Sequence, residues 1–450
     1  MQFGTLSKSH ASILHPEAYV IYWAQLLHFY QPPTQVPSVL NKICNESYYP
    51  LLRVFEEYSN ARLTVNFNGV LIDMLMDCGH KDIIEGFRNL AEMGQIEFTG
   101  TAKYHPILPL IPGEEVKRQI DLNALTNRHF FGRSYAPQGF FPPEMCYSRD
   151  ILRPIVNSGY HWIILSGIAC PAEWPVDVVY GARYDGQRIA ILFRDDVLSN
   201  RISFRNIQAK ELIAHLEQWQ GTRENIYVVT AMDAETYGHH IQGWERTFLA
   251  RVYEELESWP ESTPDIQQAI ALAGQHVSLL TNGEAATKIQ MVTVSRLLEL
   301  FPQGQTIEPL ASSWSTTADD IRRGNYYPLW QDRSNEVHRL QWEHLGICIE
   351  LVGKALEYAD NEESRRSATI ARGLLDRAEH SCQMWWASNR PMWDINLIHM
   401  GLLDQWRTVV NAYRAINKSG ARQETKQEYY RRAVAARDIR SKLEDRLFAQ

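Results

Sequence analysis

The sequence has no apolar run long enough to cross a membrane and no block of basic residues. Its longest apolar window, Tyr19–Tyr30, is interrupted by Gln25 and His28 and is shorter than the roughly 20 residues that a membrane helix needs. The 45 Lys and Arg residues are outnumbered by 53 Asp and Glu residues, which gives a net charge of −8. Since a phosphate-binding surface needs a basic stripe, we expect neither nucleic acid nor a membrane as partner.

Cysteine is scarce, and its six residues are far apart without a Cys-x-x-Cys pair. This pattern argues against a zinc ribbon and against a disulfide scaffold, so we expect free thiols. The N-terminus places Lys8 and His10 before a mixed polar stretch, whereas a secretory signal would have an apolar segment there. These features predict a cytoplasmic protein.

The first two-thirds of the chain alternate β-rich runs with helical patterns, which is typical of a parallel sheet built from βα units. The strand candidates are Tyr19–Leu27, Leu63–Phe67, Ile96–Phe98, Gly139–Phe141, Trp162–Leu165, Ile189–Phe193 and Ile226–Ala231. The helix candidates between them include Asp82–Met93, Glu114–Phe131, Arg149–Asn157 and Ala209–Trp219. Seven strands predict a closed or nearly closed barrel.

The strands disappear from about Asn335 onward, and four stretches with helical spacing follow. These stretches are Val337–Tyr358, Glu363–Cys382, Leu397–Ile416 and Gln423–Phe448. We therefore expect a catalytic barrel over 1–315, a linker over 316–334, and a helical domain over 335–450 that contributes to the active-site cleft.

Polar residues gather where the predicted strands end. His28 and Gln31 follow the first, Asn66 and Asn68 the second, Glu144 the fourth, Asp195 and Asp196 the sixth, and Asp233 and Glu235 the seventh, while Glu97 lies within the third. In a (β/α) barrel the active site lies at the C-terminal ends of the strands, so these side chains are expected to converge on one cleft.

Two carboxylates stand out among them. Glu144 follows Pro142-Pro143, which cannot continue a central strand, so it should lie in the loop at the mouth of the barrel. Asp233 and Glu235 are separated by one residue and would share a face if extended, which would raise the pKa of one of them. The alternatives are helix-terminal carboxylates, or solvated and capping carboxylates in a loop.

Further candidates have structural alternatives of the same kind. Glu97, inside an apolar strand, needs either a salt-bridge partner or a ligand hydroxyl. His28 and Gln31 carry donors and acceptors suited to sugar hydroxyls, although a histidine at a strand end is often structural. Trp385 and Trp386 suit either a helical core or stacking on a sugar ring.

In order, five segments resemble the regions by which glycoside hydrolase family 57 is recognised. They are His28–Pro32, Gly94–Glu97 with Tyr104–Pro106, Phe141–Glu144, Met232–Gly238 and Ser381–Ser388. The commoner form of the first region has a second histidine where this chain has Tyr30, and the third often has tryptophan where this chain has Phe141. Both departures bear on the subfamily and its product.

The resemblance implies a (β/α)7 barrel, distorted relative to a TIM barrel, followed by an all-helical domain. It also implies a retaining glycoside hydrolase or transglycosylase acting on α-glucans, with Glu144 as nucleophile and Asp233 as acid/base. The residues expected to bind substrate are His28, Gln31, Glu97, His105, Glu235, Trp385 and Trp386. No metal or cofactor is expected, and the oligomeric state is not indicated. Hydrolysis, glucanotransfer and branching all stay open, and α-galactosidase is a rarer activity of the family.

Two other function classes stay open at this point. One is a metal-dependent carbohydrate hydrolase or deacetylase, in which His239, His240, Asp233 and Glu235 would supply zinc ligands, although no His-Glu-x-x-His spacing is present. The other is a glucan-binding protein without turnover. Chelation and turnover measurements separate these classes.

Overall fold

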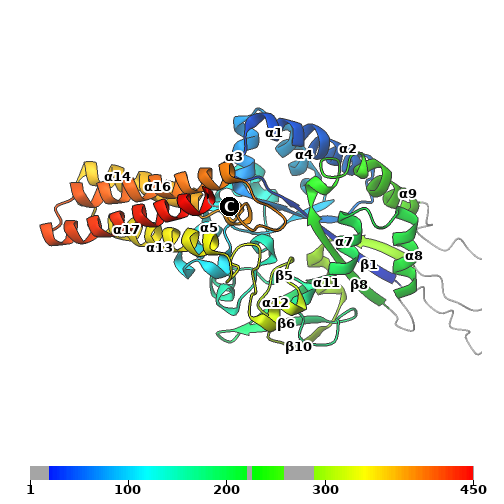
Figure 1. The fold of residues 1–450 in the computed structure, drawn as a ribbon. Coiled ribbons are helices and arrows are strands. Elements are labelled where there is room, and N and C mark those ends of the chain that lie inside the picture. The colour runs from blue at the N-terminus through cyan, green and yellow to red at the C-terminus, as the bar shows by residue number, and fades with distance from the viewer. Residues whose placement is uncertain (1–19, 220–224, 258–287, 449–450) are drawn as a thin grey trace, which may run out of the picture.

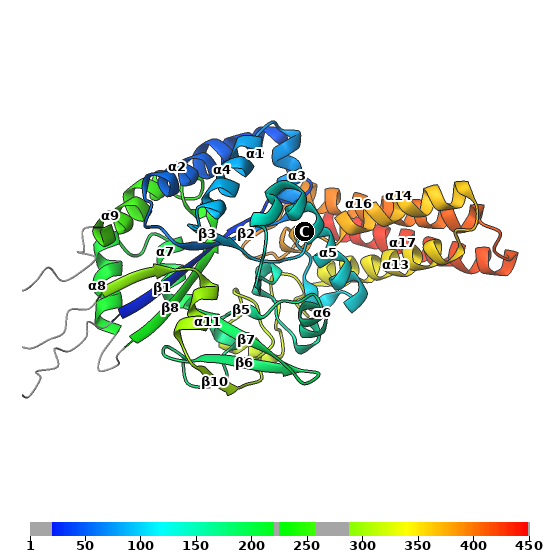
Figure 2. The ribbon, with the colours of Figure 1, turned by 180° about the vertical axis from the view of Figure 1, so that it is seen from behind.

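The computed structural model describes residues 20–219, 225–257 and 288–448, so Tyr19 of the first predicted strand lies outside the described residues. A barrel of strands and helices forms one part of the fold, and a bundle of long helices extends from it to one side (Figure 1, Figure 2). All six cysteines are free thiols, as predicted. None of the helices in the described ranges is long and apolar enough to span a bilayer.

Seven parallel strands form the barrel, in the order β3-β2-β1-β8 on one side and β7-β5-β4 on the other. Their bounds are β1 Val20–Phe29, β2 Leu63–Phe67, β3 Ile96–Phe98, β4 Gly139–Phe140, β5 Trp162–Ser166, β7 Gln187–Arg194 and β8 Asn225–Asp233. A backbone bridge between Gly100 and Phe140 joins β3 to β4. The Asp195 amide donates to the Val229 carbonyl at 2.8 Å and joins β7 to β8. The predicted seven-stranded barrel is therefore confirmed.

Strands of this barrel are buried on both faces, which is why they read as apolar runs in the sequence. Every residue of β2 and β5 is buried. The covering helices are α1 Pro37–Ile43, α2 Tyr49–Glu57, α3 Gly69–Asp77, α4 Lys81–Glu92, α5 Gly113–Phe131, α6 Leu152–Asn157, α7 Asp196–Ser203, α8 Ala209–Trp219, α9 Arg251–Glu257 and α11 Val294–Leu300.

Three further strands were not predicted. β6 (Val179–Tyr184) runs antiparallel to β7, β10 (Gln303–Thr306) pairs with β6, and β9 (Lys288–Val292) pairs with the first half of β1. The turn between β6 and β7 is Asp185-Gly186, and both residues have positive φ values. Asp-Gly is a strong hairpin signal, so this pair was readable from the sequence.

The helical part consists of α13 Glu336–Tyr358, α14 Glu362–Ala378, α15 Cys382–Trp385, α16 Ile395–Lys418 and α17 Gln423–Phe448. A single helix over Glu363–Cys382 was predicted, and this was wrong because α14 ends at Ala378. The chain then turns toward the barrel, where the Ser381 amide donates to the His105 carbonyl at 3.0 Å. The short helix α12 (Ala318–Arg323) lies within the predicted linker.

Candidate active site

Glu144 and Asp233 lie where β4 and β8 end. Glu144 follows Pro142 and Pro143 in a short 3₁₀ turn and has a φ of +57°, in the region that favours glycine. Strain of this kind costs about 1–3 kcal/mol and is frequent at functional sites. Asp233 is the last residue of β8 and pairs in register with His28 of β1. Both carboxylate side chains are partly exposed, so a ligand can reach them.

The surroundings of Glu144 favour retention of its proton. Trp314 donates its indole N–H to Glu144 Oε2 at 2.8 Å, and His105 Nδ1 lies 3.7 Å from Oε1. Burial raises the pKa of Glu144 to about 8, with a further contribution from the charge of Asp233, and the Trp314 bond opposes this rise. The charge of Asp233 therefore acts directly on Glu144.

Burial also raises the pKa of Asp233, while His28 and Arg194 oppose that rise. The Arg194 guanidinium is fixed by bonds to the Ala231 carbonyl and to Asp196 Oδ1, both at 2.7 Å. Two carboxyl groups with raised and interacting pKa values are the arrangement that acid–base chemistry needs.

A stack of rings lies beside the two carboxylates. His28 stacks between Phe141 and His105, with ring centroids 4.7 and 4.9 Å apart, and His105 stacks on Tyr30 at 3.9 Å. Burial lowers the pKa of both histidines, and the charge of Asp233 opposes this at His28. Each Nε2 atom is buried without a hydrogen-bond partner among the described residues. These nitrogens are therefore free to bond a ligand hydroxyl.

Glu235 lies behind Asp233 and is almost fully buried. Gln31 Nε2 donates to its Oε1 at 2.9 Å, and the Tyr48 hydroxyl donates to the same oxygen. Residues Ala234–Thr236 form a 3₁₀ turn, so Asp233 and Glu235 are not extended as the sequence argument assumed. Burial raises the pKa of Glu235 to about 8, and the charge of Asp233 adds to the rise.

Glu235→Gln is expected to flatten the pH dependence of stability. The folded chain holds the Glu235 proton up to about pH 8, whereas the unfolded chain releases it near pH 4.3, so this group costs stability increasingly as pH rises between those values. Urea unfolding at pH 5, 6.5 and 8 measures this slope, with Glu114→Gln on the exposed start of α5 as control. Identical pH slopes for wild type and Glu235→Gln would contradict the expectation.

Glu97 is not brought to these carboxylates. Its Oε1 accepts bonds from Thr64 Oγ1 at 2.7 Å and from the Ser295 amide at 2.9 Å. Glu97 of β3 pairs with Thr64 of β2, and Thr64 pairs with Leu26 of β1, which lies two residues before His28. Glu97 therefore lies deeper in the barrel than His28. Ser295 belongs to the first turn of α11, where a carboxylate satisfies free amides. Glu97 therefore caps α11 in this structure.

The two predicted tryptophans lie in different surroundings. Trp386 is 4% exposed and packs into the core of the helical part, with its ring edge against His380. Trp385 is partly exposed. On the same short helix, Cys382 Sγ lies 3.4 Å from the Tyr30 hydroxyl and so brings α15 to the end of β1. Of the pair, only Trp385 has surface available for a ligand.

The structure adds residues that the sequence did not assign to the site. Nothing in the sequence around Trp314 indicates Glu144 as its partner. Arg194 ends β7 and directly precedes Asp195 and Asp196, the pair to which the sequence pattern points. Of those, Asp195 caps α7 through the Leu198 amide at 2.8 Å. Position at a strand end was the one signal available for Arg194.

The histidines proposed as zinc ligands have other surroundings. His239 Nδ1 bonds Glu46 Oε2 at 2.7 Å, and His240 is exposed. Across residues 20–219, 225–257 and 288–448, no three His, Cys, Asp or Glu side chains are arranged to hold a metal ion.

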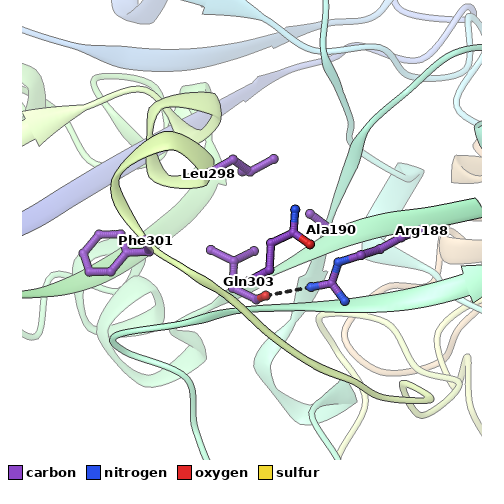
Figure 3. A pocket seen from close by; sticks show the side chains of 6 residues that line it. Arg188, Ala190, Leu298, Phe301 and Gln303 are labelled. Carbon is purple, nitrogen blue, oxygen red and sulfur yellow. Dashed lines mark hydrogen bonds between the residues drawn. The ribbon is translucent and has the colours of Figure 1, made fainter.

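A small cavity of about 40 Å³ lies between β6, β7 and the segment from α11 to β10 (Figure 3). It is lined by Val179, Arg188, Ala190, Leu298, Phe301 and Gln303. The Arg188 guanidinium donates to the Val179 carbonyl at 3.0 Å. Ligand pockets usually measure about 300–1,000 Å³, so this cavity is too small for a sugar and is separate from the candidate site.

Comparison with known proteins decides the family. The model of glycosyl hydrolase family 57 matches residues 8–276 of this chain. The chain belongs to glycosyl hydrolase family 57. That match includes both carboxylates, the ring stack and Glu235, but ends before Trp314 and the helical part.

Family 57 relatives with curated names are distant. Alpha-amylase 1 of Dictyoglomus thermophilum is 23% identical over 247 residues, which cover 52% of this chain and 35% of the relative. The 4-alpha-glucanotransferase of Thermococcus litoralis is 24% identical over 310 residues, which cover 66% of this chain and 42% of the relative. The matched region thus spans less than half the length of these relatives.

Solved structures of the family match nearly the whole chain. The GH57 branching enzyme of Thermococcus kodakaraensis has a TM-score of 0.63 at 15% identity, covering 93% of this chain and 95% of that chain. The 4-alpha-glucanotransferase of Thermococcus litoralis has a TM-score of 0.64 at 17% identity, covering 89% of this chain and 60% of that chain. At such low identities these likenesses establish the fold, a (β/α)7 barrel followed by helices.

Proposed function

We propose that this chain is a glycoside hydrolase or transglycosylase that acts on α-1,4-linked glucans by retaining double displacement. The supporting observation is the pair of partly exposed carboxyl groups, Glu144 and Asp233, whose charges interact at the ends of β4 and β8. Family membership and the names of the relatives, α-amylase and 4-α-glucanotransferase, favour an α-glucan as substrate.

In the proposed reaction, ionised Glu144 attacks the anomeric carbon while Asp233 gives its proton to the leaving oxygen. The resulting ester between the sugar and Glu144 is cleaved by water or by a sugar hydroxyl, and Asp233 takes up the proton of that acceptor. His28 and His105 would hold sugar hydroxyls through their unpartnered Nε2 atoms. Gln31 and Glu235 would support the loop that carries Asp233.

Burial raises the pKa of both carboxyl groups, and other contacts oppose the rise at each. The pKa of Glu144 is raised to about 8, whereas His28 and Arg194 both favour the ionised form of Asp233. The assignment of the two roles rests on the resemblance to the family, and a trapping experiment tests it independently.

Product analysis with maltoheptaose tests the activity. Shorter sugars with matching new reducing ends would mean hydrolysis, and a ladder of both longer and shorter sugars would mean transfer. New branch points in amylose would mean branching. No change in any of these substrates would contradict an α-glucan as substrate.

Azide trapping with an aryl α-maltoside tests the roles. In Glu144→Ala, azide should take the place of the nucleophile and yield the β-glycosyl azide by one inversion. In Asp233→Ala, azide should attack the glycosyl-enzyme and yield the α-glycosyl azide by two inversions. The reverse pattern would exchange the two roles.

Trp314→Phe is expected to lower kcat/KM by roughly 10–100-fold, because a bond to a charged group contributes about 1.5–3 kcal/mol. Phenylalanine keeps the ring but removes the N–H that donates to Glu144. The pKa of Glu144 should rise further, so the acid limb of the pH–rate profile should move to higher pH. Trp406→Phe, whose ring contacts Arg440, is the control. An unmoved acid limb would contradict this role of Trp314.

The two alternative functions have less support. The described residues contain no cluster of three metal-ligating side chains, and activity that survives chelation would count against a metal-dependent reaction. A glucan-binding protein without turnover would bind maltoheptaose and leave it unchanged.

A further inference from the structure

A π-helical turn lies between α1 and α2 and packs on the loop that follows Asp233. The turn is Cys44–Tyr48, and the loop comprises residues 234–241. π-helices are rare, occur mostly as single turns inside α-helices, and are frequent at functional sites. The position of this turn against the loop therefore indicates a role beyond the packing of α1 and α2.

Two buried side chains of the turn bond the residues directly after Asp233. Ser47 Oγ donates to the Ala234 carbonyl at 3.0 Å, and the Tyr48 hydroxyl donates to Glu235 Oε1. Ser47 and Tyr48 are both fully buried. Because one peptide bond joins Ala234 to Asp233, a fixed Ala234 carbonyl leaves the Asp233 backbone little freedom to turn.

Glu46 of the same turn holds a later part of the loop. Its Oε2 bonds His239 Nδ1 at 2.7 Å. Its carbonyl oxygen approaches Gly238 so closely that a Cβ atom there would lie 1.8 Å from it, and Gly238 has a φ of +104°. Glycine is the residue that permits both this approach and this backbone conformation. The loop is therefore held near its start and near its end by one turn.

The π geometry accounts for three consecutive side chains that contact one loop. In an α-helix, with 3.6 residues per turn, three consecutive side chains spread over an arc of roughly 200°. A π turn bonds residue i to i+5 and has more residues per turn, so this arc is narrower. The wider turn thus brings Glu46, Ser47 and Tyr48 toward the same side of the helix.

Bonds within the loop spread the hold of the turn over its whole length. The Tyr237 amide donates to the Ala234 carbonyl at 3.0 Å, which is the oxygen that Ser47 also bonds. The His240 amide donates to the Glu235 carbonyl at 2.8 Å. These two amides therefore report whether the loop opens when contacts to the turn are removed.

We propose that the π turn Cys44–Tyr48 positions Asp233 for proton transfer to the leaving oxygen, with Ser47 and Tyr48 as the positioning residues. Both act through the loop, since neither has surface available for a ligand. The catalytic consequence rests on the proposed function, whereas the hold of the turn on the loop does not. A helical turn between β1 and β2 then determines how the acid at the end of β8 is aimed.

Amide hydrogen exchange, followed by mass spectrometry on the full chain, tests the hold on the loop. Ser47→Ala and Ser47→Ala/Tyr48→Phe should each speed exchange in peptides that contain residues 234–241, by roughly two- to tenfold for each lost hydrogen bond. Ser419→Ala is the matched control, because Ser419 is also buried and its Oγ donates to the Ile416 carbonyl at 2.7 Å. This control should leave exchange of the loop unchanged.

A substrate whose leaving group needs no proton separates positioning from a general loss of structure. The first step on α-maltosyl fluoride forms the bond from Glu144 to the anomeric carbon, and fluoride leaves with the electron pair of the broken bond. Ser47→Ala/Tyr48→Phe should therefore lower kcat/KM for maltoheptaose by roughly 10–100-fold, and kcat/KM for the fluoride by less than about threefold. Asp233→Asn, which removes the proton itself, should show the same split to a larger extent.

Equal losses on the two substrates would overturn the proposal, because a merely structural role predicts them. A loop that exchanges as slowly in both variants as in wild type would also overturn it. If wild type acts on neither substrate, the proposed function fails, and the exchange measurement then decides whether the π turn holds the loop.

Discussion

Glu144→Gln and Asp233→Asn are each expected to lower kcat/KM on maltoheptaose by at least about 10³-fold with the fold intact. Gln removes the nucleophilic oxygen charge and Asn removes the transferable proton, and each role contributes several orders of magnitude to such a reaction. Neither change alters side-chain size, and both positions are partly exposed, so stability should change little. Initial rates together with circular dichroism and urea unfolding measure the two effects separately.

Glu97→Gln is the matched control, because it removes a third carboxylate of the same barrel. Its partners are Thr64 and the Ser295 amide, so kcat/KM should stay within about threefold even if stability falls. Full activity in Glu144→Gln or Asp233→Asn would refute the assigned chemistry. A loss in Glu97→Gln as large as theirs would mean that Glu97 acts in the site after all.

The barrel was readable from the sequence because of how parallel strands are buried. Strands such as β2 and β5 are buried on both faces. They therefore appear in the sequence as short, nearly continuous apolar runs, which are typical of parallel strands. The polar residues directly after these runs then point to one end of the barrel. That reasoning placed Glu144, Asp233 and His28 at the same end of the barrel, where the structure also has them.

Contacts across the fold were not readable in the same way. Trp314 reaches Glu144 from 170 positions away, and Ser381 reaches His105 from 276 positions away. No local pattern specifies such a pairing, because it depends on how the connection after β10 and the turn after α14 pack on the barrel. For Glu97 the sequence predicts the strand but not its contacts. Its partners Thr64 and Ser295 lie deeper in the barrel than Glu144 and Asp233, and no local pattern indicates this.

Arg372→Met is expected to destabilise the chain by about 3–5 kcal/mol, because it leaves the largely buried carboxylate of Glu115 without its cation. Arg372 of α14 bonds both Glu115 oxygens of α5 at 2.8 Å and lies 2.9 Å from Asp376. The side chains of Arg372 and Glu115 are each 11% exposed, so solvent cannot replace the lost partner of Glu115, whereas Asp376 keeps its bonds to Arg118. This cluster joins the helical part to the barrel. Urea unfolding at neutral pH measures the loss.

Arg366→Met is the matched control, since Arg366 is exposed on the same helix and its loss should change stability by less than about 0.5 kcal/mol. Adding Glu115→Gln to Arg372→Met should recover part of the loss, because one of the stranded charges is then gone. If Arg372→Met unfolds like Arg366→Met, the ion cluster does not hold α14 on α5. If the double variant is no more stable than the single one, the cost comes from lost packing of the arginine stem and not from unpaired charge.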